Sequence, residues 1–345
     1  MTRLILTTSD SGGGNLKVAR LADLVAPLAL ELVWGAVPAD TKLAQMLGPR
    51  SAKQDPAFHT WLDGINRSGR EAIEAKGVGL IDFCAEFEKV ELWVDPDPNA
   101  QLILIWLLSC FRGHEAASRL SLVQAQVRIA EKLPEVISAW VPPPVAVTRE
   151  HLDIASIACD AYRAPSPEAW FDLLARDLSR LPRLRPAVLA LLEELPGRDS
   201  GLGATERRLL DLIDDGCVHP FDLFPGDKKL NERRVFEYWV IGGLLDGLAH
   251  CPAPAVKGLE EGPFNLDMHE DRARHERYRQ SRLSLTPLGE AILAGRDEIS
   301  VGTTRSAAGG VAPNSPMTSS GAGTRRGARS LRHEIPGSAQ CAAPE

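Results

Sequence analysis

Short apolar, β-prone segments alternate with helical patterns along the first 125 residues, and this alternation is the strongest constraint on the fold. The apolar segments are residues 3–8, 28–34, 90–94 and 120–125. Helical periodicity follows the first segment at residues 16–24, a charged stretch at 52–75 is interpreted as helix, and Asn99 is expected to cap an apolar helix at 100–111. Short buried strands that alternate with helices indicate a largely parallel sheet. The sequence therefore predicts an α/β domain over residues 1–141.

The second half of the chain is mainly helical. Helical patterns cover residues 149–195, 203–213 and 235–248, and a short strand is predicted at 281–285. Thr286 and Pro287 then give the signature of a helix start, with Thr as the cap and Pro at the first position. We interpret residues 149–198 as a helical linker region and residues 199–298 as a winged-helix-like domain. Residues 299–345, rich in Ser, Thr, Gly and Ala and without periodicity, are predicted to be a disordered tail.

Charge and cysteine usage narrow the classes of protein. The net charge of −7 argues against tight nonspecific binding to nucleic acid, which needs clustered Lys and Arg. The six cysteines show no Cys-x-x-Cys spacing, which suits a reducing compartment. No secretory signal is visible, and the most apolar segment, residues 101–111, is too short to span a bilayer. We expect a cytoplasmic protein with no membrane partner.

The first candidate site is a glycine-rich stretch after the first predicted strand. It consists of Ser9, Asp10, Ser11, Gly12, Gly13, Gly14 and Asn15. Backbone amides of such a loop, with the N-terminus of the following helix, can hold a small anionic ligand. The stretch matches neither the dinucleotide-binding pattern nor the Walker pattern, and a tight turn that requires positive φ is an equally valid interpretation.

The second candidate site is the pair Asp95 and Asp97, directly after the strand at 90–94. Ligands of open parallel sheets bind at this end of the strands. Two carboxylates there can hold a metal ion or act as acid and base, although acidic residues beside prolines more often cap the next helix. No catalytic triad order is recognisable, so whether the chain is an enzyme, and which cofactor it would use, stays open.

A third candidate is a basic cluster that precedes the strand at 281–285. Its members are Arg272, Arg274, Arg277, Arg279 and Arg282. These side chains could contact a phosphate backbone. Residues 201–300, however, contain 13 basic and 18 acidic residues, a net charge of −5. A module that contacts a protein partner is therefore at least as well supported as one that reads DNA.

Several phrases, taken in order, resemble a bacterial family of unassigned activity, domain of unknown function 1835 with its associated C-terminal region. They are Thr7-Thr8-Ser9-Asp10-Ser11, Glu91-Leu92-Trp93-Val94-Asp95 followed by Gln101-Leu102, and residues 181–196, 201–207 and 283–295. The resemblance implies an α/β domain followed by helical and winged-helix-like parts, and it carries over no catalytic residue. The family often has Asp-x-x-Asp-Gln-Leu after the Leu-Trp strand, and the spacing from Asp95 to Gln101 departs from that pattern.

The resemblance also bears on the tail. Relatives end with tryptophan-rich phrases that are missing after Gly295. Synonymous codons exist for residues 317–324 that, read from the third base, encode Asp-Ile-Val-Trp-Arg-Trp-Asp, so we hypothesise a frame change near residue 300.

Three functions follow from these features. The first is a regulatory or sensor protein that binds a small anion or nucleotide. The second is a metal-assisted enzyme that acts on a phosphorylated substrate, with Asp10, Asp95 or Asp97 as metal or acid–base groups. The third is a winged-helix protein that binds nucleic acid, against which the acidic charge argues.

Overall fold

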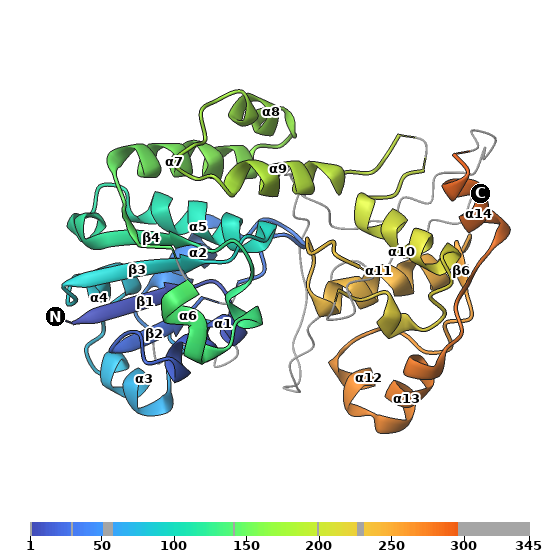
Figure 1. Cartoon of the computed structure of the whole chain (residues 1–345), viewed down its shortest axis with the longest axis horizontal. Coiled ribbons are helices and arrows are strands. Elements are labelled where there is room, and N and C mark those ends of the chain that lie inside the picture. The colour runs from blue at the N-terminus through green and yellow to red at the C-terminus, as the bar shows by residue number, and fades with distance from the viewer. Residues whose placement is uncertain are drawn as a thin grey trace, which may run out of the picture. The chain divides into compact units, whose positions relative to one another are not determined.

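The computed structural model describes residues 2–28, 30–50, 58–140, 142–198, 200–225 and 231–295. The chain divides into two compact units (Figure 1). The first contains the residues up to Leu32 and Val37–Val188, and the second contains Val33–Ala36 and the described residues from Leu189. The predicted linker over 149–198 is thus shared, because residues 149–188 pack within the first unit. The predicted tail and its proposed frame change lie outside the described residues.

A mostly parallel, five-stranded sheet forms the centre of the first unit, as the alternation of strands and helices predicted. Its strands are β1 (Arg3–Thr7), β2 (Leu24–Pro27), β3 (Lys89–Val94), β4 (Leu120–Gln124) and β5 (Val145–Ala146). They lie in the order β2-β1-β3-β4-β5, and only β5 is antiparallel to its neighbour. The mixed α/β architecture is confirmed.

The predicted strand at 28–34 is wrong, because β2 occupies Leu24–Pro27 instead. The periodicity had assigned Leu24 to the preceding helix. That helix ends at Val18, and Arg20 adopts a left-handed φ of 54°, which turns the chain toward the sheet. Residues 4 and 24 are therefore partners in the ladder between β1 and β2. The helix predicted over 52–75 is also shorter, since in the described part of that range the helix runs over Arg67–Glu74.

Helices cover both faces of the sheet (Figure 1). They are α1 (Asp10–Val18), α2 (Asp40–Leu47), α3 (Arg67–Glu74), α4 (Leu80–Cys84), α5 (Pro98–Phe111), α6 (Pro134–Trp140), α7 (Arg149–Arg163) and α8 (Glu168–Leu174), with 3₁₀ turns η1 (Glu115–Arg119) and η2 (Ile129–Glu131). On one face, Leu16 of α1 and Ile137 of α6 join Ile5 and Val123 in a buried cluster. On the other face, α5 lies under α7 (Figure 1), and its apolar residues are buried nearly all round.

The second unit is mainly helical and carries a two-stranded antiparallel sheet. Its elements are the end of α9 (Leu184–Glu193), α10 (Ala204–Asp214), η3 (Pro220–Asp222), α11 (Tyr238–His250), β6 (Val256–Lys257), α12 (Leu266–Glu270), α13 (Arg272–Gln280), β7 (Ser284–Leu285) and α14 (Pro287–Leu293). The Thr286 hydroxyl accepts a hydrogen bond from Gly289 N at 3.2 Å, so the predicted cap of the last helix is confirmed. Within the described ranges, no helix has the length and hydropathy needed to cross a membrane.

Candidate functional site

The candidate site lies at the carboxyl edge of the parallel sheet. From β1 the chain crosses to β2 on one side, and from β2 it returns to β3 on the other side of β1. The direction of the crossovers therefore reverses between β1 and β3, which is where open α/β sheets bind their ligands. Ser9 follows β1 and Asp95 follows β3, so both residues lie at this reversal.

Ser9 begins α1 and contacts Asp95. Its hydroxyl accepts a hydrogen bond from Gly12 N at 3.2 Å and donates one to Asp95 Oδ2 at 3.0 Å. A side-chain oxygen at this position satisfies one of the first amides of a helix, which have no intrahelical acceptor. The same hydroxyl thus fixes the start of α1 and connects the ends of β1 and β3.

The three glycines lie inside α1, so the predicted glycine loop is wrong, and so is the turn with positive φ. Their role is close packing. A Cβ on Gly13 would lie 2.4 Å from Pro27 Cγ, and one on Gly12 would lie 2.7 Å from the Ser9 hydroxyl oxygen. A Cβ on Gly14 would meet nothing within 4 Å. Gly13 therefore lets α1 approach β2, as glycine does in other helices packed on a strand.

Asp95 is the most buried carboxyl group of the edge, with 2% of its surface exposed. Its Oδ1 accepts a hydrogen bond from Ile129 N at 2.8 Å, and its Oδ2 accepts the bond from Ser9. Burial raises the pKa of Asp95 to about 6, against the opposing effect of the Ile129 amide, and the nearby Asp97 charge raises it further. Asp95 is thus a buried acid that titrates near neutral pH.

Asp97, and not Asn99, caps α5. Asp97 Oδ1 accepts a hydrogen bond from Ala100 N at 3.0 Å. The Asn99 amide instead donates to Leu30 O at 2.6 Å and accepts from Leu32 N at 2.7 Å. Pro98 explains the shift, because proline favours the first position of a helix and so moves the cap to residue 97.

Arg128 was missed by the sequence reasoning. Its Nε lies 3.6 Å from Asp97 Oδ2, and its charge lowers the pKa of Asp95. The signal that could have identified it is its place shortly after β4, which parallels that of Ser9 after β1 and Asp95 after β3. The edge therefore combines a helix N-terminus, two carboxyl groups and one guanidinium group.

The remaining residues of the glycine-rich stretch divide into two groups. Asp10 and Ser11 are exposed in the first turn of α1. Asn15 is used structurally, because its side-chain amide donates to Lys132 O at 2.8 Å and to Ala130 O at 3.3 Å. A ligand could therefore contact the side chains of the first turn of α1, but not those of the whole stretch.

Buried polar atoms without a hydrogen-bond partner among the described residues also occur at the edge. They are Thr7 Oγ1, Gln101 Oε1 and Gln124 Oε1. An unpaired buried polar atom costs roughly 1–3 kcal/mol, and such atoms are often explained by a bound ligand or water. They lie in the last residues of β1 and β4 and in the first turns of α5, beside the residues described above.

Three of the five arginines of the predicted basic cluster are paired with glutamates, and the other two, Arg272 and Arg282, are exposed. Arg274 and Arg277 both contact Glu261, and Arg279 contacts Glu276 at 2.7 Å. All three lie on α13. Phosphate binding would require these side chains to exchange their partners, so the arrangement disfavours the nucleic-acid interpretation.

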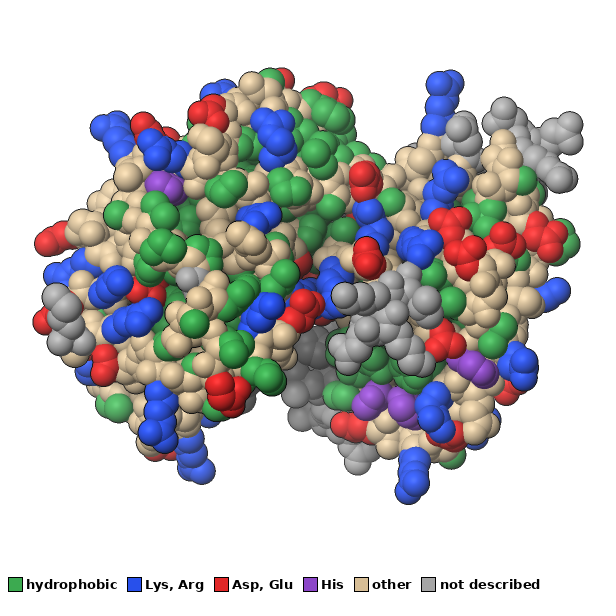
Figure 2. All heavy atoms as spheres, in the orientation of Figure 1, with side chains coloured by type: hydrophobic (Ala, Val, Ile, Leu, Met, Phe, Trp, Pro, Cys, Tyr) green, Lys and Arg blue, Asp and Glu red, His purple; other side chains and the backbone are tan. Residues whose placement is uncertain are grey.

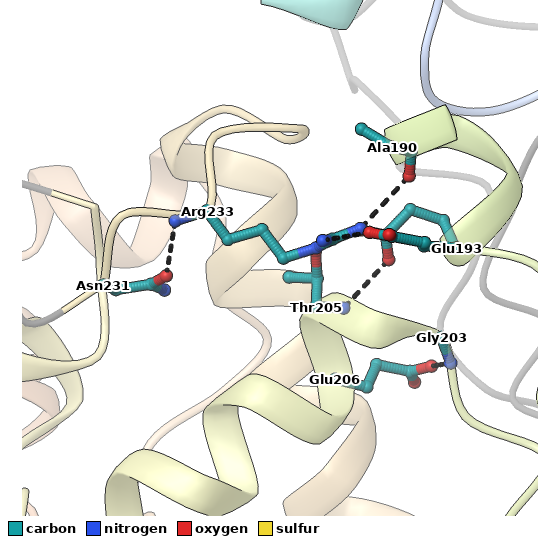
Figure 3. Close-up of polar contacts among 8 residues, drawn as sticks. Ala190, Glu193, Gly203, Thr205, Glu206, Asn231 and Arg233 are labelled. Carbon is teal, nitrogen blue, oxygen red and sulfur yellow. Dashed lines mark hydrogen bonds and ion pairs between the residues drawn. The ribbon is translucent and has the colours of Figure 1, made fainter. Parts of the chain in front are cut away.

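A second polar cluster, in the second unit, is internally satisfied (Figure 3). Glu194 accepts hydrogen bonds from Thr205 N at 3.0 Å and from the Thr205 hydroxyl at 2.6 Å. Arg233 binds Glu194 through Nε at 2.7 Å and Glu193 through Nη1 at 2.7 Å. Since the carboxylate of Glu194 already occupies the N-terminal turn of α10, this cluster joins three segments of the unit and leaves no place for an external anion.

Neither the carboxyl edge of the sheet nor the cluster around Glu194 and Arg233 brings together enough ligands for a metal ion. Within the described residues, no group of three or more His, Cys, Asp and Glu side chains could hold one. Comparison with protein-family models gave no match, and no curated protein matches the chain. The resemblance to the family of unassigned activity therefore stays a prediction.

Proposed function

We propose that the first unit binds a small anionic ligand of the nucleotide class at the carboxyl edge between β1 and β3, and that the protein acts as a regulator or sensor. The observation that carries the proposal is the hydrogen bond between Ser9 and Asp95, which joins the ends of two strands at the reversal of the crossovers. The N-terminal turn of α1 starts at the same place and supplies amides and a positive partial charge.

The charges of the edge favour a ligand that offers hydroxyl groups as well as an anion. The amides of α1 suit a phosphate, and so does Arg128 when it exchanges Asp97 for the ligand, whereas Asp10 is an acceptor for a donor such as a ribose hydroxyl. Inorganic phosphate has no ribose hydroxyl to donate to Asp10, so no hydrogen bond offsets its repulsion by the carboxylates of the edge. We therefore expect nucleotides to bind more tightly than phosphate itself.

The metal-assisted alternative is less well supported by these carboxyl groups. Both oxygens of Asp95 accept hydrogen bonds, and Asp97 caps α5 while it faces Arg128. A metal ion would have to replace these partners. The alternative would be favoured only by a ligand effect that depends strictly on a divalent cation.

The test is a thermal-shift titration of the full chain with ATP, GTP and inorganic phosphate, each with and without Mg²⁺. Ser11→Asp adds an acidic group to the exposed first turn of α1, where it stabilises the free protein by about 0.3–1 kcal/mol but repels an anion. Ser11→Asn is the matched neutral control. The proposal expects nucleotide stabilisation that Ser11→Asp reduces and Ser11→Asn keeps; equal responses of the two variants would contradict it.

We infer further that the second unit is a winged-helix-like module for contacts with a protein partner. In support, α10 and α11 precede a pair of antiparallel strands, β6 and β7, and α14 follows with a Thr-Pro start. Two helices, α12 and α13, lie between β6 and β7 in the chain, which departs from a simple wing. Binding of duplex DNA at moderate salt would contradict the protein-contact role, and the paired arginines of α13 predict none.

A further inference from the structure

An aromatic cluster fills one side of the second unit, and Phe264 lies at its centre. The cluster contains Phe221, Phe224, Tyr238, Trp239, Phe264, His269, His275 and Tyr278. Phe264 is 1% exposed, and its ring centroid lies 5.1 Å from that of Tyr238, 5.3 Å from Trp239 and 4.9 Å from Tyr278. Tyr238 and Trp239 thus rest on a rigid, buried ring.

Gly242 makes room for that ring. A Cβ on Gly242 would lie 2.0 Å from the Phe264 ring, so any other residue would displace it. Glycine inside a helix costs about 1 kcal/mol relative to alanine, and Gly242 lies in the middle of α11. Gly242 therefore weakens α11 but leaves the space that the Phe264 ring occupies beneath Tyr238 and Trp239.

The three most exposed rings of the cluster stand nearly perpendicular to one another. The ring planes of Tyr238 and Trp239 differ by 85°, those of Tyr238 and His269 by 84°, and those of Trp239 and His269 by 73°. Their centroids are 5.2, 6.4 and 5.6 Å apart in the same order. Tyr238 and Trp239 are 37% and 38% exposed, and His269 is exposed on α12. We call these three side chains the aromatic corner.

The surroundings of the aromatic corner are acidic. The segment from 258 to 271, which carries Phe264 and His269, contains five acidic residues and no Lys or Arg. The neighbouring α13 begins with Arg272, and its Arg274 and Arg277 pair with Glu261 of that segment. Residues 258–280 together hold six acidic and four basic residues, so the net charge there is −2. Figure 2 shows histidine side chains beside hydrophobic ones on this part of the second unit. Because the faces of aromatic rings are also negative, the site favours a cation.

We propose that the aromatic corner binds a quaternary or methylated ammonium group. Such a cation is weakly hydrated and bulky, so contact with several ring faces replaces its water at low cost, and perpendicular rings can contact it from more than one side. The exposed parts of Tyr238 and Trp239 gain burial from the same contact. This site lies in the second unit and does not depend on the proposed ligand of the first.

The test compares choline with 3,3-dimethyl-1-butanol, its neutral isostere, by NMR titration of the full chain. If the charge matters, choline binds at least about fivefold more tightly than the isostere, which corresponds to the usual strength of a cation–π contact. Shifts should include the indole N–H of Trp239. Equal affinities of the two probes, or no binding of choline, would overturn the proposal.

Two variants make the test specific to the aromatic corner. Trp239→Leu keeps an apolar side chain but removes the π face, so we expect a loss of choline affinity of about fivefold or more in a protein that still unfolds cooperatively. Phe171→Ala removes an aromatic side chain that is 56% exposed on α8 and should leave choline binding unchanged. Choline affinity that survives Trp239→Leu, or falls equally in Phe171→Ala, would contradict the assignment.

Discussion

The hydroxyl of Ser9 donates a hydrogen bond of 3.0 Å to the carboxyl group of Asp95, across the point where the crossovers of the sheet reverse. Asp95 N also donates to the Thr8 hydroxyl at 3.3 Å, so backbone and side chain both join the two strand ends. The Ile129 amide adds a third segment on the other oxygen of the carboxyl group. The edge is therefore held in one arrangement before any ligand binds.

Asp95 should make stability depend on pH. Its folded pKa of about 6 lies above the ordinary value of 3.8, so the folded protein binds the proton more tightly than the unfolded chain does. The contribution to the free energy of unfolding is fully present below about pH 3.8 and is lost as pH rises through about 6. Urea unfolding of the native chain and of Asp95→Asn should differ in this window, by at most about 3 kcal/mol.

Asp95→Asn is a fair comparison because the Ser9 hydroxyl can reverse its role and accept from the new amide. The native chain should gain stability relative to the variant as pH falls from 7.5 to 5, so that the two unfolding free energies converge, because protonated Asp95 buries no charge and neither does Asn. A difference that stays constant over that range would show that Asp95 does not titrate as described.

Gly13 and Gly14 should respond in opposite ways to alanine. Gly13→Ala places a Cβ 2.4 Å from Pro27 Cγ and should destabilise the protein by about 1–3 kcal/mol through overpacking. Gly14→Ala meets nothing within 4 Å and should stabilise α1 by up to about 1 kcal/mol. Chemical denaturation of both variants measures the effect, and equal destabilisation would argue against close packing of α1 on β2.

Gly242 and Gly243 offer the same comparison in the second unit. Gly242→Ala drives a methyl group into the Phe264 ring, so we expect destabilisation by about 1–3 kcal/mol and a changed near-UV circular dichroism spectrum. A Cβ on Gly243 meets nothing within 4 Å, and Gly243→Ala should be neutral or stabilising. An unchanged spectrum in Gly242→Ala would show that Phe264 does not lie against α11.

The Arg233–Glu194 pair should matter far more than an exposed ion pair. Glu194 is 5% exposed, and Arg233→Ala would leave its buried carboxylate without its guanidinium partner, at a cost of about 3–5 kcal/mol. Arg180 pairs with Glu150 at 2.7 Å on the surface, and Arg180→Ala should cost less than about 1 kcal/mol. Thermal unfolding of the two variants gives the comparison, and similar losses would contradict the structural role of the pair.

The sequence predicted the strands β1, β3 and β4, because their residues form continuous apolar runs that end in polar turns. It missed β2, because Leu24 also fits the helical spacing set by Leu16 and Leu21. Local periodicity cannot decide such a case. What decides it is the left-handed Arg20, which is a rare conformation for a residue with a side chain.

The residues of the candidate site were predicted better than their roles. Ser9 and Asp95 were identified because they follow strands, yet their mutual contact depends on the order of the strands, which the sequence does not contain. The glycines suggested a loop, whereas the reason for Gly13 is the proximity of Pro27, a tertiary contact. Arg128 was missed because it follows β4, whereas Asp95 and Asp97, which it approaches, follow β3.

Hydrogen–deuterium exchange with and without ATP tests the central claim most directly. The account predicts slower exchange of amides in residues 9–15 and 125–131 when the nucleotide is bound, since these segments meet at the edge through Asp95 and Asn15. The protection should be reduced in Ser11→Asp and kept in Ser11→Asn. Protection confined to other segments, or no effect of ATP and GTP at saturating concentration, would contradict the account.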